Sequence, residues 1–434
     1  MTSRTRLFAG ARASLAGALG TLAVLVLAVS CTSSSELLTV QSPSRIPAAS
    51  LEDPANAQIL VNGAIGDFEC AFGSYVVLGG LIGDELDDAT QTADRYPYDM
   101  RTMTSKDTRY STSACTALGV YTPLQTARVS ADNIRRLLTG WTDQQVANRK
   151  TLLATAEVYE AYSMLLLGEG FCSTTFSTFD ANGNIQYNPE ITPAQAEAQA
   201  EAMFTTALTD AQAAGATTIA NLALVGRARA RLDQGNLAGA RADAILVPAG
   251  FSYTATASGT VSRRNNRVWG ENNSLGISSS VGTYYQNLND PRVPVVDFHK
   301  KSVTGIELWE QTKYPSVSSP IRFASSDEAQ LIVAEADIGT NNAEAVGILN
   351  ASRAKGNEPA LDPASSAATL KAAVIEERRR ALFLEGYHLG DFIRYTLPLN
   401  PPAGATFPGG GTYGSNRCLP LPDVERLNNP VLNH

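Results

Sequence analysis

The stretch "IEERRRALFLEGYHLGDFIRY", residues 375–395, decides how this sequence is interpreted. It places acidic residues, arginines and a histidine among bulky apolar residues. Gly386 suits the cap at the end of a first helix, and Asp391 suits the start of a short second helix. Apolar residues recur on roughly one side of the first helix, at Leu370, Val374, Ala381 and Leu384.

The charges of this stretch favour a structural ion network. Each buried charge needs a neighbour of opposite sign, and alternating charges flanked by apolar residues meet that need. We expect Glu377 to pair with Arg380 along the helix, and Glu385 to lie close to Asp391 and Arg394. The predicted network comprises Glu377, Arg378, Arg380, Glu385, Asp391 and Arg394.

A second interpretation of the stretch is a glycoside hydrolase, with Glu385 and Asp391 as paired carboxylates beside His388. The neighbouring arginines would keep both carboxylates ionised, whereas a general acid must hold its proton near neutral pH. We therefore expect no catalytic residue and no enzyme activity.

The amino-terminal residues have the plan of an export signal. Arginines precede the small and apolar run "LAGALGTLAVLVLAV", and Ser30 and Cys31 follow it. The run is short for a membrane span, and a small residue directly before cysteine suits lipoprotein processing. We expect a lipoprotein signal peptide over residues 1–30, lipidation at Cys31 and a flexible tether over residues 31–50. Secretion with Cys31 as a free thiol is the alternative.

The remaining cysteines suggest disulfides, because their number is even and the chain is routed to an oxidising compartment. Four cysteines allow three pairings, and the sequence does not choose firmly among them. We favour Cys70 with Cys115, which closes a modest loop, and Cys172 with Cys418.

No metal site or cofactor is expected. There is no CxxC pair, and "FDANGNIQYNPEI" begins like a calcium loop but has Ile185 and Ile191 where glycine and glutamate are required. A turn between two short strands explains that segment better. The acids of "GDELDDAT", from Asp84 to Asp88, are interpreted as a solvated helix start. A formal charge of −8 and a pI near 5.1 give nucleic-acid binding no electrostatic support.

Helical spacing dominates two parts of the chain, residues 130–248 and 324–355. Small residues around the "GN" turn at Gly235 allow two antiparallel helices to approach closely, as in tetratricopeptide-like hairpins that stack into a superhelix. The "GTNN" turn near residue 340 marks a looser second hairpin. Between the two parts, residues 250–320 are rich in Ser, Asn, Gly and aromatic residues and are predicted to be an irregular, loop-rich insertion.

The stretch "EERRRALFLEGYHLGDFIRY" resembles the carboxy-terminal signature of the SusD/RagB outer-membrane nutrient-binding lipoproteins. The order of segments before and after it is similar too: "NDPRVPVVDF", "TKYP", "PIRFASSDEAQLIVAEA", "AVGILNASRAKG" and "CLPLPDVERLNNPVLN". The stretch departs from the family pattern in three features. Ala381 replaces an acid, "YH" replaces a His-Arg pair, and Gly390 replaces a bulky aromatic residue.

The resemblance implies a mainly α, SusD-like domain over residues 51–434, with the signature region at about 368–434. It also implies a binding protein that is anchored in the outer membrane and exposed at the cell surface. Such a protein captures a glycan or another small nutrient for a SusC-like TonB-dependent transporter. An alternative is a tetratricopeptide-like lipoprotein scaffold that binds only proteins during envelope assembly.

No ligand motif is shared across that family, so candidate ligand-binding residues must come from the chemistry of the side chains. Sugar rings present apolar faces that stack on aromatic rings, and their hydroxyl groups need polar neighbours. Aromatic residues in irregular segments are therefore the candidates, although each could equally anchor its own loop. They are Tyr96 and Tyr98 in an early loop, and Trp269, Tyr284 and Tyr285 in the insertion.

Overall fold

The computed structural model describes residues 52–115, 118–180, 183–273 and 276–432. The predicted signal peptide, the lipidation site Cys31 and the tether lie outside these ranges. Residues 52–434 group into one compact unit. Its described part is mainly helical, and its strands pair into four two-stranded antiparallel sheets.

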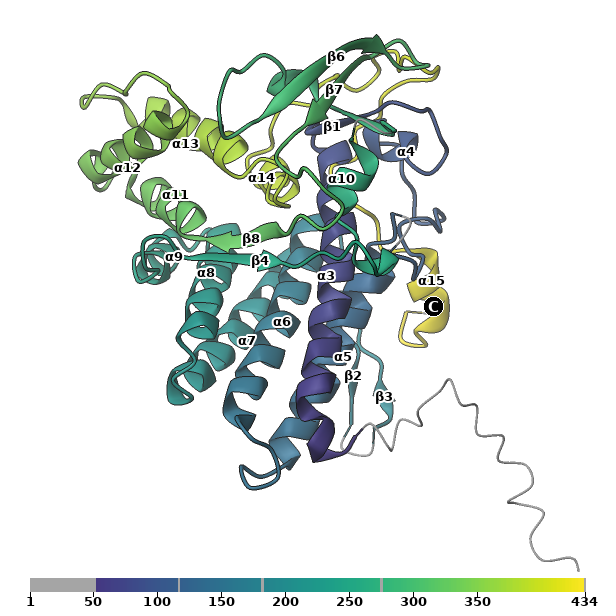
Figure 1. The fold of residues 1–434 in the computed structure, drawn as a ribbon, viewed down its shortest axis with the longest axis vertical. Coiled ribbons are helices and arrows are strands. Elements are labelled where there is room, and N and C mark those ends of the chain that lie inside the picture. Colours follow the sequence, from purple (N-terminus) through teal and green to yellow (C-terminus); the bar gives the residue numbers. More distant parts are fainter. Residues whose placement is uncertain (1–51, 116–117, 181–182, 274–275, 433–434) are drawn as a thin grey trace, which may run out of the picture. The chain divides into compact units, whose positions relative to one another are not determined.

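A stack of long helices forms the larger half of the molecule (Figure 1). Each helix packs on the next in the order α3 (Ala57–Ile82), α5 (Tyr121–Gly140), α6 (Arg149–Gly170), α7 (Pro193–Ala213), α8 (Thr217–Asp233) and α9 (Leu237–Ala244). Helix α3 is apolar enough to cross a membrane by composition, but 83% of its most apolar window is buried inside the protein. It is therefore the core helix of the stack, covered by α5, α6 and α10.

The second group of helices follows the insertion and packs on the stack through α9 and α8. It consists of α11 (Ser326–Asp337), α12 (Asn342–Lys355), α13 (Ala367–Ala381) and α14 (His388–Arg394). Shorter helices are α4 (Tyr96–Asp99), α10 (Arg267–Glu271), α15 (Asp423–Asn428) and the 3-10 turns η1 (Pro54–Asn56), η2 (Ser262–Arg264) and η3 (Thr283–Tyr285).

Both predicted hairpins are present, which confirms the tetratricopeptide-like interpretation of the fold. Gly235 adopts a positive φ of 75° between α8 and α9, a conformation that glycine reaches without strain. The next residue, Asn236, caps α9 by accepting a hydrogen bond from the backbone N–H of Gly239 at 3.0 Å. Between α11 and α12, Gly339 likewise adopts a positive φ, and the side chain of Asn341 caps α12.

The predicted insertion is more regular than expected. Strand β4 (Ser252–Ala255) pairs with β8 (Ile321–Ser325), and β6 (Val295–Lys301) pairs with β7 (Glu307–Gln311). Strand β5 (Ser279–Val281) pairs with β1 (Leu86–Asp88), which lies far earlier in the chain. The predicted turn between short strands is confirmed by the pairing of β2 (Thr178–Phe179) with β3 (Ile185–Gln186). The pairing of β1 with β5, which lie far apart in the chain, has no local sequence signal.

Aromatic packing around Phe323 of β8 joins the insertion to the helical stack. Its ring lies 5.0 Å from that of Tyr162 in α6, 5.2 Å from that of Phe68 in α3 and 5.5 Å from that of Tyr253 in β4, measured between centroids. Rings at these separations and tilts stabilise one another beyond the area they bury. The insertion is thus fixed to the core at its base, and its outer part is left to form surface.

The signature stretch has boundaries that differ from the prediction. Helix α13 ends at Ala381, five residues before Gly386, and Asp391 lies inside α14 instead of capping it. The segment between the helices turns through positive φ values at Leu384 and Gly386. The backbone N–H of Leu384 donates to the carboxylate of Glu85 at 2.9 Å, so a residue from the early part of the chain holds this turn.

Candidate functional site

The charged side chains of the signature stretch form ion pairs in the structure, with fewer contacts among themselves than predicted. Arg378 Nε lies 2.7 Å from Asp391 Oδ2, and Arg394 Nη2 lies 2.9 Å from Asp391 Oδ1. Arg394 also pairs with Glu335 of α11 at 2.5 Å. The two arginines hold the pKa of Asp391 below its usual range, against the opposing effect of burial.

Glu385 and Glu377 have other partners than those predicted. Glu385 lies 2.7 Å from Lys313 and 2.9 Å from Arg322, not beside Asp391. Glu377 pairs with Arg292 at 2.5 Å. The predicted Glu377–Arg380 pair is wrong, because Arg380 instead contacts Glu376 and Glu358. The partners of Glu377 and Glu385 thus come from the insertion (Arg292 and Lys313) and from β8 (Arg322), whereas the prediction placed them within the signature stretch itself.

His388 is structural in this arrangement. Its Nε2 lies 2.6 Å from the carbonyl oxygen of Gly83, at the end of α3. Burial, together with the charge of Arg379, lowers the pKa of His388 to about 4. The neutral imidazole therefore donates a hydrogen bond that ties α14 to α3, which is a packing role and not an acid–base role.

Two of the predicted ligand-binding aromatics are inaccessible. Tyr98 and Tyr285 are 0% exposed. The ring of Tyr285 packs 4.7 Å from that of Phe383. In the part of the chain that the structure describes, neither ring has a free face, so both are corrected to loop anchors.

Tyr284, Trp269 and Tyr96 are partly buried. The guanidinium of Arg379 covers the ring of Tyr284 at 3.5 Å, and the hydroxyl of Tyr284 donates to Glu376. Trp269 packs against the main core, and Tyr96 packs against Phe407. Such packing supports loop anchoring for all three, and Trp309, which also packs against the main core, differs from them because it lines a hollow.

The best candidate for a ligand site is a hollow of about 490 Å³ beside strands β6 and β7. Trp309 of β7 lines it, and so do the exposed amide side chains of Asn287, Asn289 and Asn357. Pro291, Val293, Pro294 and Val295 add apolar surface. A volume of several hundred Å³ with one aromatic ring and a few amides matches what small-ligand sites provide.

The three asparagines that line the hollow beside β6 and β7 share an unusual backbone conformation. Asn287, Asn289 and Asn357 have φ values of 59°, 52° and 58°. Asparagine adopts this left-handed region more readily than most residues, at a modest cost that persists where the surrounding structure demands it. The bends at Asn287 and Asn289 lie in the loop that leads from Tyr285 to β6, and Asn357 follows α12.

Trp309 and Asn357 were not among the residues predicted from the sequence. Trp309 lies within "ELWEQ", where two adjacent apolar residues between polar ones give no clear alternation and do not single out a binding residue. Asn357 reaches the hollow only because α12 ends there. A signal was present in "QNLNDP", where two asparagines precede a proline.

The acids of "GDELDDAT" are not a solvated helix start. Asp84, Glu85 and Asp88 are buried at the end of α3 and in β1. Burial raises the pKa of Asp84 to about 6 and that of Glu85 to about 7. Arg101 pairs with Asp84 at 2.7 Å, and Glu85 accepts the hydrogen bond from the backbone N–H of Leu384, so these acids connect distant segments.

The structure also contains two disulfides, Cys70–Cys115 and Cys172–Cys418. The first joins α3 to the segment before α5. The second joins the end of α6 to the segment before α15, beside the parallel bridge of Phe171 with Leu419.

Comparison with protein-family models found no match, and no curated protein matches in sequence. Solved structures do match in fold. A SusD superfamily protein from Bacteroides fragilis aligns with a TM-score of 0.66 at 14% identity over 88% of this chain and 99% of that chain. A SusD-like carbohydrate binding protein from Bacteroides vulgatus aligns with a TM-score of 0.65 at 14% identity over 88% and 97%.

A third match is the surface glycan-binding protein A from Bacteroides uniformis, with a TM-score of 0.65 at 13% identity over 87% of this chain and 98% of that chain. These alignments cover nearly the whole of each matched protein. The chain therefore has the SusD-superfamily fold that its signature stretch led us to expect.

Proposed function

We propose that this protein is an outer-membrane, lipid-anchored binding protein, tethered through Cys31, which captures a glycan or related nutrient for a SusC-like TonB-dependent transporter. The observation that carries the proposal is the hollow at Trp309, which combines an aromatic ring with three exposed amides on a SusD-like fold. The names of two matched proteins, which describe carbohydrate or glycan binding, support the choice of ligand.

The chemistry of the hollow suits a sugar. An indole ring offers a broad apolar face to the C–H face of a pyranose, and amides both donate and accept hydrogen bonds, as hydroxyl groups require. The nearest acid, Asp290, is buried and held by Arg292 at 2.7 Å, so it is not available as a catalytic carboxylate. Binding without bond cleavage is the outcome that this set of side chains supports.

Trp309→Ala is expected to weaken glycan binding at least about 30-fold, the effect of removing a central aromatic contact worth about 2 kcal/mol. The measurement is affinity electrophoresis against soluble starch, xylan and mucin glycans, followed by calorimetry with the one that binds. Tyr187→Ala is the control, because Tyr187 is an exposed aromatic near the distant β2–β3 hairpin. Equal retention of the Trp309 variant and the native protein would place the ligand elsewhere.

We propose further that the transporter contacts the helical face made by residues 227–247 and 329–353. Stacked helices give a broad rigid platform, whereas loops give adaptable pockets. Three apolar side chains on the first segment are exposed without a covering element: Leu237 at 39%, Ile245 at 48% and Leu246 at 64%. Exposed apolar residues that gather in this way are a common feature of protein-binding surfaces.

The double substitution Ile245→Asp with Leu246→Asp should abolish co-purification of a barrel protein from native outer membranes while leaving glycan affinity unchanged. Charged groups cannot be desolvated against an apolar partner surface without a large cost. Val303→Asp is the control, since Val303 is 86% exposed in the β6–β7 turn. If the double variant still recovers the barrel protein, or if Val303→Asp loses it, the contact surface is wrongly assigned.

A further inference from the structure

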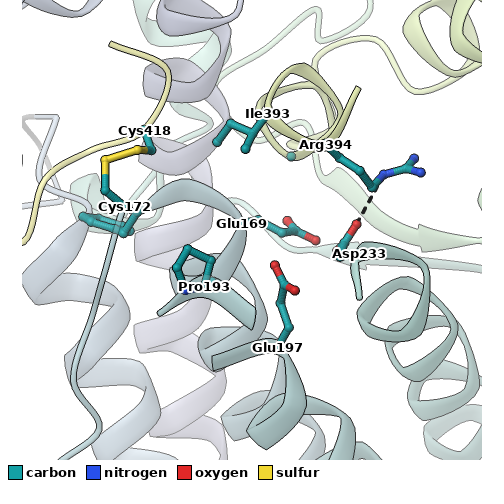
Figure 2. Close-up of a pocket in the computed structure, with 11 residues that line it drawn as sticks. Glu169, Cys172, Pro193, Glu197, Asp233, Ile393, Arg394 and Cys418 are labelled. Atoms are coloured by element: carbon teal, nitrogen blue, oxygen red, sulfur yellow. Dashed lines mark ion pairs between the residues drawn. A yellow bond between two sulfur atoms is a disulfide. The ribbon is translucent and has the colours of Figure 1, made fainter. Parts of the chain in front are cut away.

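A second cavity, distinct from the Trp309 hollow, lies where α6, α7, α8 and α14 meet (Figure 2). Its volume is about 350 Å³. The carboxyl groups of Glu169, Glu197 and Asp233 come from three different helices and converge on it, as Figure 2 shows. The predicted function makes no use of this cavity, and none of the three acids was singled out by the sequence.

Glu197 is the acid without a partner. It is only 8% exposed, and it forms no hydrogen bond or ion pair with any residue in the described ranges. Burial, followed by the charge of Asp233, raises the pKa of Glu197 to about 7. Its carboxyl group lines the cavity and faces the other two acids (Figure 2), and no donor in the described ranges pairs with it, so it is free to accept a hydrogen bond from a ligand or to pair with a cation.

Glu169 and Asp233 are each only partly compensated, by a guanidinium group at 3.9 Å and 3.6 Å respectively. Their carboxyl groups lie within hydrogen-bonding reach of each other, and Oε2 of Glu169 and Oδ2 of Asp233 are buried without a donor. Two carboxylates in contact need a proton or a cation between them. Burial raises the pKa of Glu169 well above its usual range and that of Asp233 to about 6.

The nearby guanidinium groups are engaged elsewhere. Arg229 forms a bidentate ion pair with Glu328, and its guanidinium lies 3.9 Å from the carboxylate of Glu169. Arg394 pairs with Glu335 and Asp391 and lies 3.6 Å from Asp233. The cavity therefore keeps an excess of carboxyl groups.

Helix dipoles add to the negative potential. Glu169 lies in the last turn of α6, which ends at Gly170, and Asp233 is the last residue of α8. The carboxyl ends of two long helices therefore face the cavity, and such ends attract positive charge. The amino end of α7, at Pro193, also lies at the cavity, and its partial positive charge offsets part of this negative potential.

Two glycines keep the cavity open. A Cβ atom at Gly390 would lie 3.4 Å from Cγ of Glu169, and one at Gly168 would lie 3.2 Å from Cγ of Glu197. Larger side chains at either position would occupy the space in front of the carboxyl groups. Gly390 is one of the three departures from the family signature noted in the sequence, so the opening belongs to this chain's own variation.

The walls indicate an organic ligand instead of a bare metal ion. Phe171, Pro193, Ile393 and the Cys172–Cys418 disulfide line the cavity beside the acids. Within the described ranges, no group of three acidic, histidine or cysteine side chains has the spacing of a metal site. An ammonium group brings three N–H donors to the acids, and an attached alkyl chain covers the apolar wall.

We propose that this cavity binds a small organic cation, a protonated primary amine on a short aliphatic chain, whose ammonium group lies among Glu197, Glu169 and Asp233. The site is separate from the glycan hollow and does not depend on it. Anions are disfavoured by the carboxyl groups, and neutral ligands leave the acids without compensating charge.

The test uses n-butylammonium as the probe, with butan-1-ol, butyrate and Ca²⁺ as comparison ligands, measured by ligand-observed NMR and calorimetry at pH 8 on the mature protein. Saturable binding of n-butylammonium alone is expected. Glu197→Gln should weaken it at least tenfold and is expected to fold normally, since the amide has the same shape and Glu197 supports no contact. Glu201→Gln removes the same charge one turn away on α7, where Glu201 pairs with Arg231, and should leave the affinity unchanged.

The pH dependence gives a second readout. The charged groups that line the cavity are Glu169, Glu197, Asp233 and Arg394, and the charges of Arg229, Glu328, Arg378 and Asp391 act on these acids from nearby, as does the hydroxyl of Tyr75 on Glu169. The amine keeps its proton between pH 5 and 8, as a lysine does. A carboxyl group with a pKa of about 7 must release its proton to pair with it, so affinity should fall as the pH drops below about 7.

Three results would overturn the proposal. They are equal affinity in the native protein and the Glu197→Gln variant, preferential binding of Ca²⁺ or butan-1-ol, and an affinity for n-butylammonium that does not change between pH 5 and 8. Loss of glycan binding in Trp309→Ala leaves this site untouched, so the two proposals fail independently.

Discussion

Glu328→Gln is expected to lower the free energy of unfolding by about 3–5 kcal/mol, the cost of leaving a buried charge without its partner. Glu328 is fully buried and accepts hydrogen bonds from Arg229 at 2.6 and 3.1 Å and from the hydroxyl of Tyr387 at 2.9 Å. Arg229 is 3% exposed, so water cannot replace the lost carboxylate. The measurement is urea unfolding of the mature protein at pH 7, followed by circular dichroism.

The control for this loss is Glu201→Gln, which removes an acid whose side chain is 25% exposed and whose partner Arg231 is 20% exposed. Surface pairs of this kind contribute up to about 1 kcal/mol. The contrast should separate the cost of a stranded buried charge from the general effect of one charge less. If Glu328→Gln and Glu201→Gln lower the free energy of unfolding equally, the buried Glu328–Arg229 pair does not stabilise the fold more than a partly exposed pair does.

Replacing Cys172 and Cys418 together with serine is expected to destabilise the protein by about 5 kcal/mol, because the bond closes a loop with a sequence separation of 246 residues. Without it the unfolded chain gains a large number of conformations. The tie between α6 and the carboxy-terminal segment also loses its covalent link. Thermal and urea unfolding of the exported protein measure the loss.

The double substitution of Cys70 and Cys115 is the matched comparison, since this bond closes a separation of 45 residues. On the same loop-entropy argument its removal should cost about 4 kcal/mol. A larger loss for the shorter loop would show that native-state contacts at Cys70, and not the entropy of the unfolded chain, dominate. Recovery of four free thiols from protein exported by its native route would contradict both bonds.

The helical hairpins were predictable because their signals are local. Gly235 with Asn236 and Gly339 with Asn341 each combine a residue that tolerates positive φ with a side chain that caps the next helix. Such pairs act within four or five residues, so the order of residues is sufficient to place the turns.

The residues of the proposed ligand site were not predictable in the same way. Tyr98 and Tyr285 have the composition of a sugar-binding loop, yet both are buried because segments distant in sequence pack over them. Trp309 lies on a partly buried strand, and Asn357 lines the same hollow only because α12 ends beside it. Exposure is a property of the folded surface, and it is not encoded in the identity of a side chain.

The sequence by itself determined the class of fold, the hairpin turns and the presence of a charged network near the carboxy end, since periodicity, capping residues and a shared order of segments are all readable along the chain. Only the tertiary structure decided which charges pair. Glu385 pairs with Lys313 and Arg322, Glu377 pairs with Arg292, and Glu197 has no ion pair within the part of the chain that the structure describes. The physical reason is that a buried charge takes whichever opposite charge the packing of distant elements places within about 4 Å, and that distance is set by the whole core.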